Sequence, residues 1–297
     1  MIDSIFRTVS GRASQRVFGA ALLATAFLGA AVAAWSSHDG GALIARTTRW
    51  LTGRSGFEQG LATAAVLVGV TLVAVVVLAM TPQVLRWLQG YWPTWLDPVR
   101  ARLVRRITSA ADRDAGAMQE LEREQRTDAR LDRRLRQLPS ESDRYLPTTL
   151  GNLVRAAQTR PIDKYGLDPV AIWPHLFLVM PEPTQKEITA AVNALERAVM
   201  AVFWCLLLVV LGPWVWWVAP LGIAAAVLLQ RTVVHGAART HAELIEAAVD
   251  LHRLDLYRKL RWPLPANPAE ERELGEQLVS YLRYGSDSAK PTFTVAE

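Results

Sequence analysis

The segment "KYGLDPVAIWPHL" holds the residues best suited to acid–base chemistry, Tyr165, Asp168 and His175. A general acid or base must lie within hydrogen-bond reach of its substrate and have a pKa near the working pH, and histidine most often meets both conditions. Prolines on both sides of the segment favour a rigid turn, in which Asp168 caps a helix while Tyr165 and Trp173 pack an interior. The sequence therefore predicts a structural role and leaves the three residues as catalytic candidates.

The other reactive side chains lack the spacing of a metal or cofactor site. His235, His241 and His252 are separated by six and eleven residues, whereas a helical metal pair has i, i+4 spacing. Acidic residues lie among them, which favours a solvated helix face with local ion pairs. The single cysteine, Cys205, lies in an apolar stretch and is expected to fill space there. We therefore expect no cofactor and no metal ion.

Three long apolar stretches determine the predicted fold. Residues 17–35 and 61–80 contain no charged residue, and each has roughly the 20 apolar residues needed to cross about 30 Å of hydrocarbon. A buried helix of a large soluble core, the alternative, usually shows a polar stripe, and neither stretch has one. Both are predicted to be transmembrane helices.

The third stretch, residues 198–230, is too long for one straight span, because such a helix would run about 48 Å. Gly212 and Pro213 are the natural break, since proline removes a helical donor and glycine tolerates turn geometry. The sequence thus predicts a helical hairpin with tryptophans at headgroup depth. A re-entrant hairpin and a single tilted, kinked span are the alternatives. The tryptophans at the predicted tip are Trp214, Trp216 and Trp217.

Arginines beside these stretches determine the predicted orientation, because positive charge near a span stays in the cytoplasm. They precede the first stretch and follow the second, although the intervening loop also carries three. We therefore expect a multi-pass protein of the bacterial cytoplasmic membrane with both termini in the cytoplasm. A cleavable secretory signal is the alternative for residues 17–35, with the same topology downstream. The residues expected at the interface after the second stretch are Trp87, Trp92, Trp95, Arg100, Arg102, Arg105 and Arg106.

Residues 99–138 alternate positive and negative charges, with apolar residues near heptad spacing. This pattern predicts a long solvated helix, and its pairing with a second copy as a coiled coil is an open alternative. The isoelectric point of about 9.6 is typical of nucleic-acid binding. The arginines, however, lie beside the membrane and among acidic residues, so anionic lipid headgroups are the expected partner and no nucleic acid is expected.

The predicted class is all-α, a polytopic helical membrane protein with four transmembrane helices and a cytoplasmic helical region. The expected segments are a basic N-terminal segment (1–16), a first transmembrane helix (17–35), an external loop (36–60), a second transmembrane helix (61–80), an interfacial aromatic elbow (81–98), a long charged helix (99–138), a cytoplasmic helical knob (139–197), a transmembrane hairpin (198–230), cytoplasmic C-terminal helices (231–285) and a disordered tail (286–297).

The motifs "LGNLVRAA", "KYGLDPVAIWPHL" and "DLHRLDLYRKLRWPLPANPAEERELGEQLVSYL" resemble those of an uncharacterised family of bacterial integral membrane proteins. The resemblance covers roughly residues 146–282, and the Y-G-x-D and W-P elements, with the W-P-L-P…EERELGEQL tail, are its most specific parts. It implies paired spans with a charged helical segment, and no particular reaction. Where the family has arginine after W-P this chain has His175, which weakens any anion-binding role for the box.

Several functional classes lack their motifs in this chain. The sequence contains no G-x-x-x-x-G-K-[ST], G-x-G-x-x-G, H-E-x-x-H or G-x-S-x-G, and so gives no basis for the nucleotide, dinucleotide, zinc-protease and hydrolase classes that use them. The apolar stretches also lack the ionisable residues that ion-coupled transporters keep near the membrane centre.

The expected function is therefore that of a non-enzymatic membrane scaffold or sensor, presenting a cytoplasmic helical module to a partner protein or to a second copy. A homo-oligomeric channel with a hydrophobic pore and an interfacial enzyme using residues 165–175 are the alternatives. Small residues at four-residue spacing are expected to let the spans pack closely. These are Ala26 and Ala30 in the first stretch, and Gly222 and Ala226 in the third.

Overall fold

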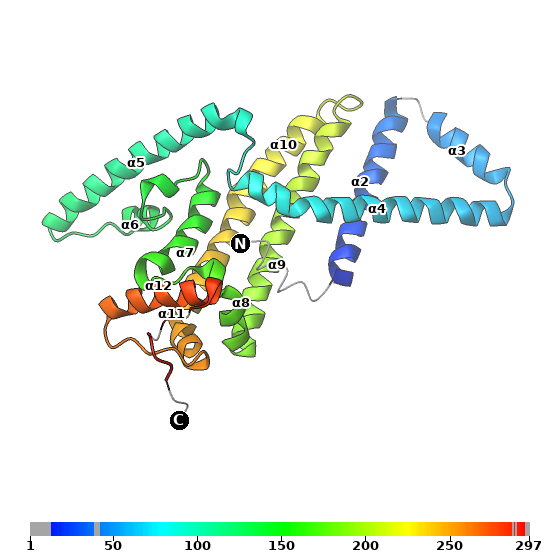
Figure 1. The fold of residues 1–297 in the computed structure, drawn as a ribbon. Helices are drawn as coiled ribbons and strands as arrows, with labels where there is room; N and C mark the ends of the chain where they lie inside the picture. The colour runs from blue at the N-terminus through cyan, green and yellow to red at the C-terminus, as the bar shows by residue number, and fades with distance from the viewer. Residues whose placement is uncertain (1–12, 39–41, 287, 289, 295–297) are drawn as a thin grey trace. The chain divides into compact units, whose positions relative to one another are not determined.

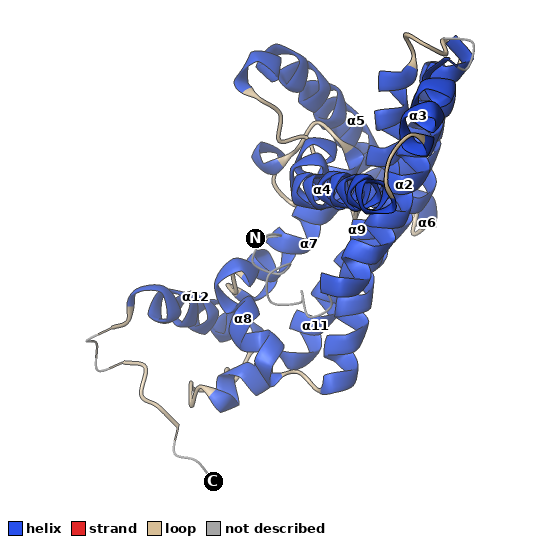
Figure 2. Cartoon of the chain, turned by 90° about the vertical axis from the view of Figure 1, so that its right-hand side faces the viewer, coloured by secondary structure: helices blue, strands red, loops and turns tan. Residues whose placement is uncertain are grey.

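The computed structural model describes residues 13–38, 42–286, 288 and 290–294. Within these residues the regular structure is helical throughout, with no strand, as Figures 1 and 2 show. The α-helices are α2 (Ala13–His38), α3 (Ala42–Thr52), α4 (Gly56–Leu88), α5 (Asp97–Arg123), α6 (Ala129–Leu135), α7 (Thr149–Tyr165), α8 (Pro169–Val179), α9 (Glu182–Leu207), α10 (Val218–Leu229), α11 (His235–Lys259) and α12 (Pro268–Tyr284). Short 3-10 turns η1 (Thr94–Leu96), η2 (Ser142–Arg144) and η3 (Leu208–Leu211) and a π turn η4 (Gln230–Val234) connect some of them.

The chain forms two compact units. The polar unit comprises Leu85–Leu195 and the described part of His235–Glu297. The apolar unit comprises the described part of Ser10–Val84 together with Glu196–Val234. Each unit is therefore assembled from segments that are far apart in the sequence.

Three helical stretches are long and apolar enough to cross a membrane, within the part of the chain that the structure describes. They are Gly56–Leu88, Glu182–Leu211 and Val218–Lys259. The last would measure about 63 Å as one helix, so only its uncharged beginning, Val218–Gln230, suits hydrocarbon. Ala21–Ser36 forms a shorter apolar helix. The all-helical structure is thus confirmed for the described residues, and three of its helical stretches have the length and composition of membrane spans.

The hairpin break occurs where the sequence predicts it. Helix α9 tightens into η3, the chain turns at Gly212, and α10 begins at Val218. The returning helix packs closely on the outgoing one, because a Cβ added to Gly222 would lie 2.6 Å from the backbone oxygen of Cys205. Gly222 and Ala226 are both buried, as expected for a packing face.

The interior of the apolar unit is a cluster of small and aromatic side chains from α2, α4 and α9. Ala24 and Ala74 are fully buried in it, and the ring centroids of Phe27 and Trp204 lie 5.6 Å apart. Small side chains at this contact let the backbones approach closely. In Figure 1, α4 runs across α2 rather than along it, and Figure 2 shows α4 nearly end-on beside an upright α2.

The core of the polar unit combines helices from both sides of the hairpin. Ile188 on α9 and Ile245 on α11 are buried in the same cluster as Trp173 on α8 and Leu278 on α12. Burying each aliphatic side chain contributes about 1.5–3 kcal/mol. The regions 139–197 and 231–285, expected as separate segments, therefore share one interior.

The predicted long helix over 99–138 is wrong in one respect, because the structure divides it into α5 and α6. Gln125 adopts a left-handed conformation (φ 55°), and the Arg126 N–H donates to the Leu121 carbonyl at 2.8 Å. This pattern is a Schellman-type helix end. Asp128 then caps α6 by accepting from the Arg130 N–H at 2.7 Å.

Two segments that were expected to be irregular contain helices or packed side chains. Residues 36–60, expected as a loop, include α3 and the first turn of α4. In the tail 286–297, expected to be disordered, Phe293 packs against Trp262 with ring centroids 6.2 Å apart, and the Thr294 N–H donates to the Arg261 carbonyl at 2.8 Å. The N-terminal basic segment 1–16 lies mostly outside the described residues.

Candidate functional site

The Y-G-x-D box is the connection between α7 and α8. Gly166 ends α7 in a left-handed conformation (φ 67°), which glycine adopts without steric cost. Leu167 is fully buried, and Asp168 caps α8 by accepting from the Val170 N–H at 2.9 Å. Trp173 of the W-P element is completely buried in the core. The box thus fixes the angle between two helices.

The three catalytic candidates are not drawn together by any interaction among the described residues. The Tyr165 hydroxyl donates to Asp250 on α11 at 2.9 Å, whereas Asp168 pairs with Arg283 on α12. His175 is exposed and lies about 10 Å along α8 from Asp168, at 1.5 Å per residue. The expected structural role of Asp168 is therefore confirmed, and the residues do not present a common reacting point.

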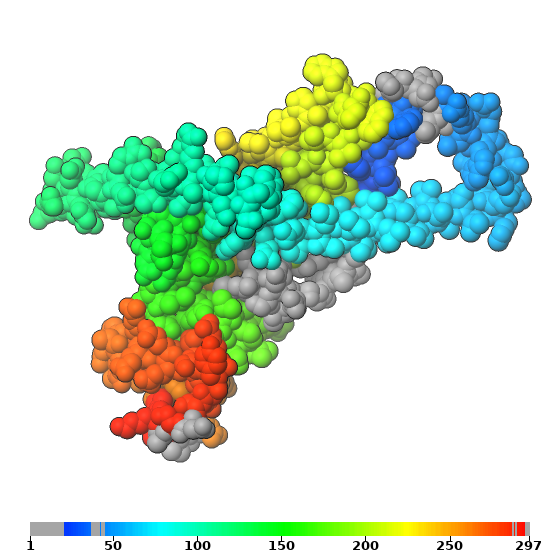
Figure 3. All heavy atoms as spheres, turned by 45° about the horizontal axis from the view of Figure 1, so that its top comes forward, coloured from blue at the N-terminus to red at the C-terminus, as the bar shows by residue number. Residues whose placement is uncertain are grey.

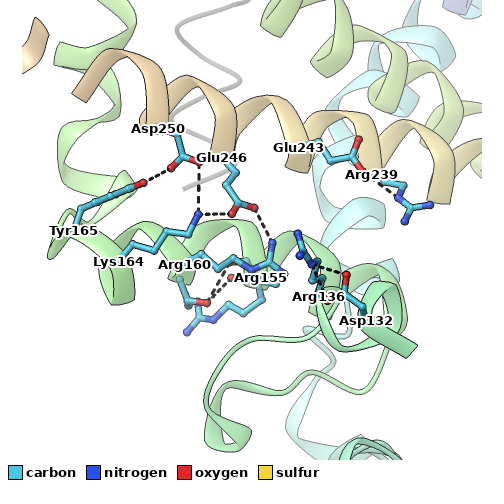
Figure 4. A network of polar contacts seen from close by, with 12 residues as sticks. Asp132, Arg136, Arg155, Arg160, Lys164, Tyr165, Arg239, Glu243, Glu246 and Asp250 are labelled. Carbon is cyan, nitrogen blue, oxygen red and sulfur yellow. Dashed lines mark hydrogen bonds and ion pairs between the residues drawn. The ribbon is translucent and has the colours of Figure 1, made fainter. Parts of the chain in front are cut away.

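A denser polar cluster joins α7 to α11, and Figure 4 shows it. Glu246 accepts from Arg160 at 2.7 Å and from Lys164 at 2.9 Å. Lys164 also lies 3.5 Å from Asp250, to which the Tyr165 hydroxyl donates. Arg160 and Glu246 are each about one-fifth exposed (22% for both side chains), so these charge-assisted contacts are stronger than ordinary surface pairs.

The cluster alters the protonation equilibria of its members. Burial acts to raise the pKa of Glu246, but the hydrogen bonds and charges of Lys164 and Arg160 outweigh it, and the pKa is lowered. Burial alone would lower the pKa of the Lys164 ammonium, but its contacts with Glu246 and Asp250 outweigh burial and raise that pKa. Burial and the bond to Asp250 raise the pKa of Tyr165. Glu246, Lys164 and Tyr165 therefore keep their ordinary charge states near neutral pH, which suits a fixed structural and recognition role rather than proton transfer.

An open groove of about 530 Å³ lies beside this cluster, between α6, α7 and α11. Its charged lining is Arg133 from α6, Arg136 directly after α6, Arg160 and Lys164 from α7, and Arg239, Glu243, Glu246 and Asp250 from α11. Five cations thus face three carboxylates. Arg239 pairs with Glu243 at 3.2 Å, and Arg136 pairs outside the lining with Asp132 at 3.0 Å. The groove therefore has a net positive lining, which favours an acidic ligand.

An ion pair between α11 and α12 extends the polar cluster of α7 and α11. Arg253 donates to Glu271 at 2.6 Å and lies over the Tyr165 ring at 4.3 Å from its centroid, a favourable cation–π distance. Glu271 is nearly buried, with 11% of its side chain exposed. Tyr165 is therefore held by α11 from two directions.

The predicted membrane-interface residues lie mostly on exposed surface. Trp87, Trp95, Trp216 and Trp217 are exposed, as are Arg102, Arg105 and Arg106. Arg100, Trp92 and Trp214 are half-buried. The Trp92 indole donates to the Trp87 carbonyl at 2.8 Å, so part of the aromatic elbow is a fixed turn.

The packing residues predicted on the first stretch lie on the other side of α2. Ala26 and Ala30 are exposed, and Ala24 is the fully buried alanine that meets the cluster of α4 and α9. Four-residue spacing occurs on several faces of an alanine-rich helix, so spacing alone does not select the face in contact.

The three histidines of α11 have different surroundings. No group of three or more potential ligands occurs among the residues that were described. His241 is instead buried, with 4% of its surface exposed, and its Nδ1 has no hydrogen-bond partner among those residues. His252 lies 3.5 Å from Asp255. Cys205 is a free, half-buried thiol in the hairpin.

The fold and the site thus define an all-helical protein with apolar helices of membrane-spanning length and a polar helical unit that carries a groove. Comparison with family models, with curated proteins and with solved structures gives no significant match to this chain. The family resemblance of residues 146–282 accordingly stays a prediction.

The Arg160–Glu246 cluster is the feature that sequence reasoning missed. Its signal is present, because Arg239, Glu243, Glu246 and Asp250 follow one face of a helix at three- and four-residue spacing. By itself, that stripe predicts a solvated helix face. The complementary cations lie on α7, more than eighty positions away in the sequence, and no local pattern links the two helices.

Proposed function

We propose that this chain is a four-span membrane protein that acts as a non-enzymatic scaffold, with its polar unit in the cytoplasm and the α6–α7–α11 groove presented to an acidic segment of a partner protein. The observation that carries the proposal is the shared interior of the polar unit, in which Ile188 and Val192 before the hairpin lie in one cluster with Ile245 and Val249 after it. Because the residues that flank 196–234 on both sides belong to one folded unit, an apolar segment that leaves that unit must return to it. This supports a hairpin over a single tilted span.

A ring contact at the hairpin tip supports the position of the first span. Trp214 at the turn lies 5.3 Å from Trp35 near the end of α2, measured between ring centroids. The end of α2 and the tip of the hairpin therefore lie together within the apolar unit. If the hairpin crosses from the cytoplasm, α2 crosses in the same direction, and its start is cytoplasmic.

Helix α4 is the second span of the proposed topology. Four spans side by side require α4 to lie along α2, whereas it crosses α2 in the structure (Figure 1). Its 33 residues are long enough for hydrocarbon with some tilt. Its last turn belongs to the polar unit, since Leu85 is included there, which supports a cytoplasmic end for α4.

Labelling of single cysteines tests the topology. In a Cys205→Ala background, we expect Ser55→Cys to react with a membrane-impermeant maleimide in sealed right-side-out vesicles. Ser109→Cys and Ser288→Cys are expected to react only after detergent opens the vesicles. All three positions are exposed, and the cysteine-free parent is the control for background. Reaction of positions 109 and 288 from opposite faces would contradict the shared cytoplasmic location.

Site-specific photo-crosslinking tests the groove as a partner surface. A photoreactive residue at Gln137, which lines the groove, is expected to give a discrete adduct with one protein in cells, whereas Gln119 on the exposed side of α5 is not. Arg133→Glu with Arg136→Glu should abolish the adduct, because it reverses the charge that attracts an acidic segment. The matched pair Arg123→Glu and Arg126→Glu lies outside the groove and should leave it intact. Equal adducts from positions 137 and 119 would refute the assignment.

A further inference from the structure

Helix α3 is largely exposed over its described side chains. Every side chain from Ala45 to Thr52 is exposed, and Figure 3 shows the atoms of α3 standing clear of the other helices of the apolar unit on the visible face. An isolated helix shorter than about 12–15 residues is marginal in water even when rich in alanine. Helix α3 has 11 residues, and its threonines disfavour helix further. A surface must therefore cover one of its sides.

The side chains of α3 divide into two faces. At about 100° per residue, Leu51 lies about 140° from Arg46 and about 160° from Arg49 on the helix circumference. Trp50 lies at the boundary between the two faces, about 40° from Arg46. Trp50 is 52% exposed, and the Arg54 guanidinium lies 5.0 Å from its ring centroid. Phe57, in the first turn of α4, is the most exposed of the large apolar residues in this region, at 82%.

This combination matches a helix that lies in the membrane interface. Such helices place tryptophan and leucine among the acyl chains and arginine among the headgroups. Helix α3 connects α2 to α4, so its ends are tied to two apolar helices. A bilayer is therefore the surface nearest to it, and the three arginines favour an anionic one.

We propose that α3 is an interfacial helix on the external face of the membrane, with Trp50, Leu51 and Phe57 among the acyl chains and Arg46, Arg49 and Arg54 bound to anionic lipid headgroups. This inference rests on the proposed function for the face of the membrane that α3 occupies, because α2 and α4 must cross the bilayer to place it on the external face. It goes beyond that function by assigning a lipid-binding surface to the segment between them.

Depth-dependent quenching tests the inference in the full-length protein. A Cys205→Ala chain carrying a single nitrobenzoxadiazole label is reconstituted into vesicles of phosphatidylcholine, with and without phosphatidylglycerol. We expect the label at Leu51→Cys to be quenched best by a lipid spin label near the headgroup, and the label at Arg49→Cys to be quenched severalfold less. Phosphatidylglycerol should increase the quenching at position 51. The substitutions Arg46→Gln, Arg49→Gln and Arg54→Gln, made together, should remove that increase.

A label at Val76→Cys, in the middle of α4, distinguishes failure of the interfacial assignment of α3 from failure of the four-span topology. If position 76 is quenched by a spin label deep in the acyl chains while positions 49 and 51 are quenched alike and weakly, α4 spans the membrane and the interfacial assignment of α3 is overturned. If position 76 is not quenched while position 51 is, α3 lies on the membrane and the four-span proposal fails. Absence of quenching at both positions would overturn both.

Discussion

Replacing Gly275 with alanine is expected to destabilise the polar unit by about 3 kcal/mol, at the upper end of the usual cost of overpacking. A Cβ at this position of α12 would lie 1.9 Å from the backbone oxygen of Tyr165. The backbone cannot rotate away as a flexible side chain can, so α12 must move off the end of α7. The same contact zone includes Gly166, whose added Cβ would lie 2.2 Å from the Arg272 oxygen.

Urea unfolding in detergent, followed by tryptophan fluorescence, measures this cost. Gly116→Ala is the matched control, because nothing lies within 4 Å of its added Cβ and alanine is favoured over glycine inside a helix by about 1 kcal/mol. The control should be as stable as the wild type or more so. Gly166→Ala should reproduce the loss at the first site. If Gly275→Ala and Gly116→Ala unfold at the same urea concentration, the close contact of α7 with α12 does not exist.

Lowering the pH from about 6.5 toward 4 is expected to reduce the stability of the polar unit through His241. Burial lowers the pKa of His241 from 6.5 to about 4, while the unfolded chain has the ordinary value. Between these two values the unfolded state binds more protons than the folded state, so the free energy of unfolding falls as the pH falls. The full difference of 2.5 pH units corresponds to roughly 3 kcal/mol, lost progressively across this window.

A leucine at position 241 isolates this contribution, because it fills similar space in the core and cannot take up a proton. Melting temperatures of His241→Leu should be nearly flat between pH 6.5 and 5, whereas those of the wild type decline. His175→Leu removes an exposed histidine and should keep the wild-type slope. The depressed pKa of Glu246 acts separately, since its contribution is present above about pH 4.5 and is lost below that. A pH slope in His241→Leu equal to that of the wild type would refute the role of His241.

Composition and local backbone preferences determine the apolar helices of this protein and several of the points where helices begin or end. Uncharged stretches of membrane length predict long apolar helices because hydrocarbon excludes charge and leaves only helices with satisfied backbone groups. The Gly212–Pro213 pair predicts the break in the last stretch, and Asp168 before a proline predicts a helix start. These features depend only on residues that are close together in the sequence, so a single sequence is enough to predict them. The helix end at Gln125 was not predicted as a break because no glycine marks it.

Only the tertiary structure decided which distant segments meet. The hairpin separates α9 from α11 in the sequence, yet Ile188 and Ile245 share one core, and Glu246 finds its cations on α7. Such contacts depend on packing between complementary surfaces. The periodicity of a helix shows which of its sides is buried, but it does not show which other helix covers that side. For the same reason the buried position of His241 and the exposed one of Ala26 follow from the neighbours that each helix acquires on folding, and not from the helix itself.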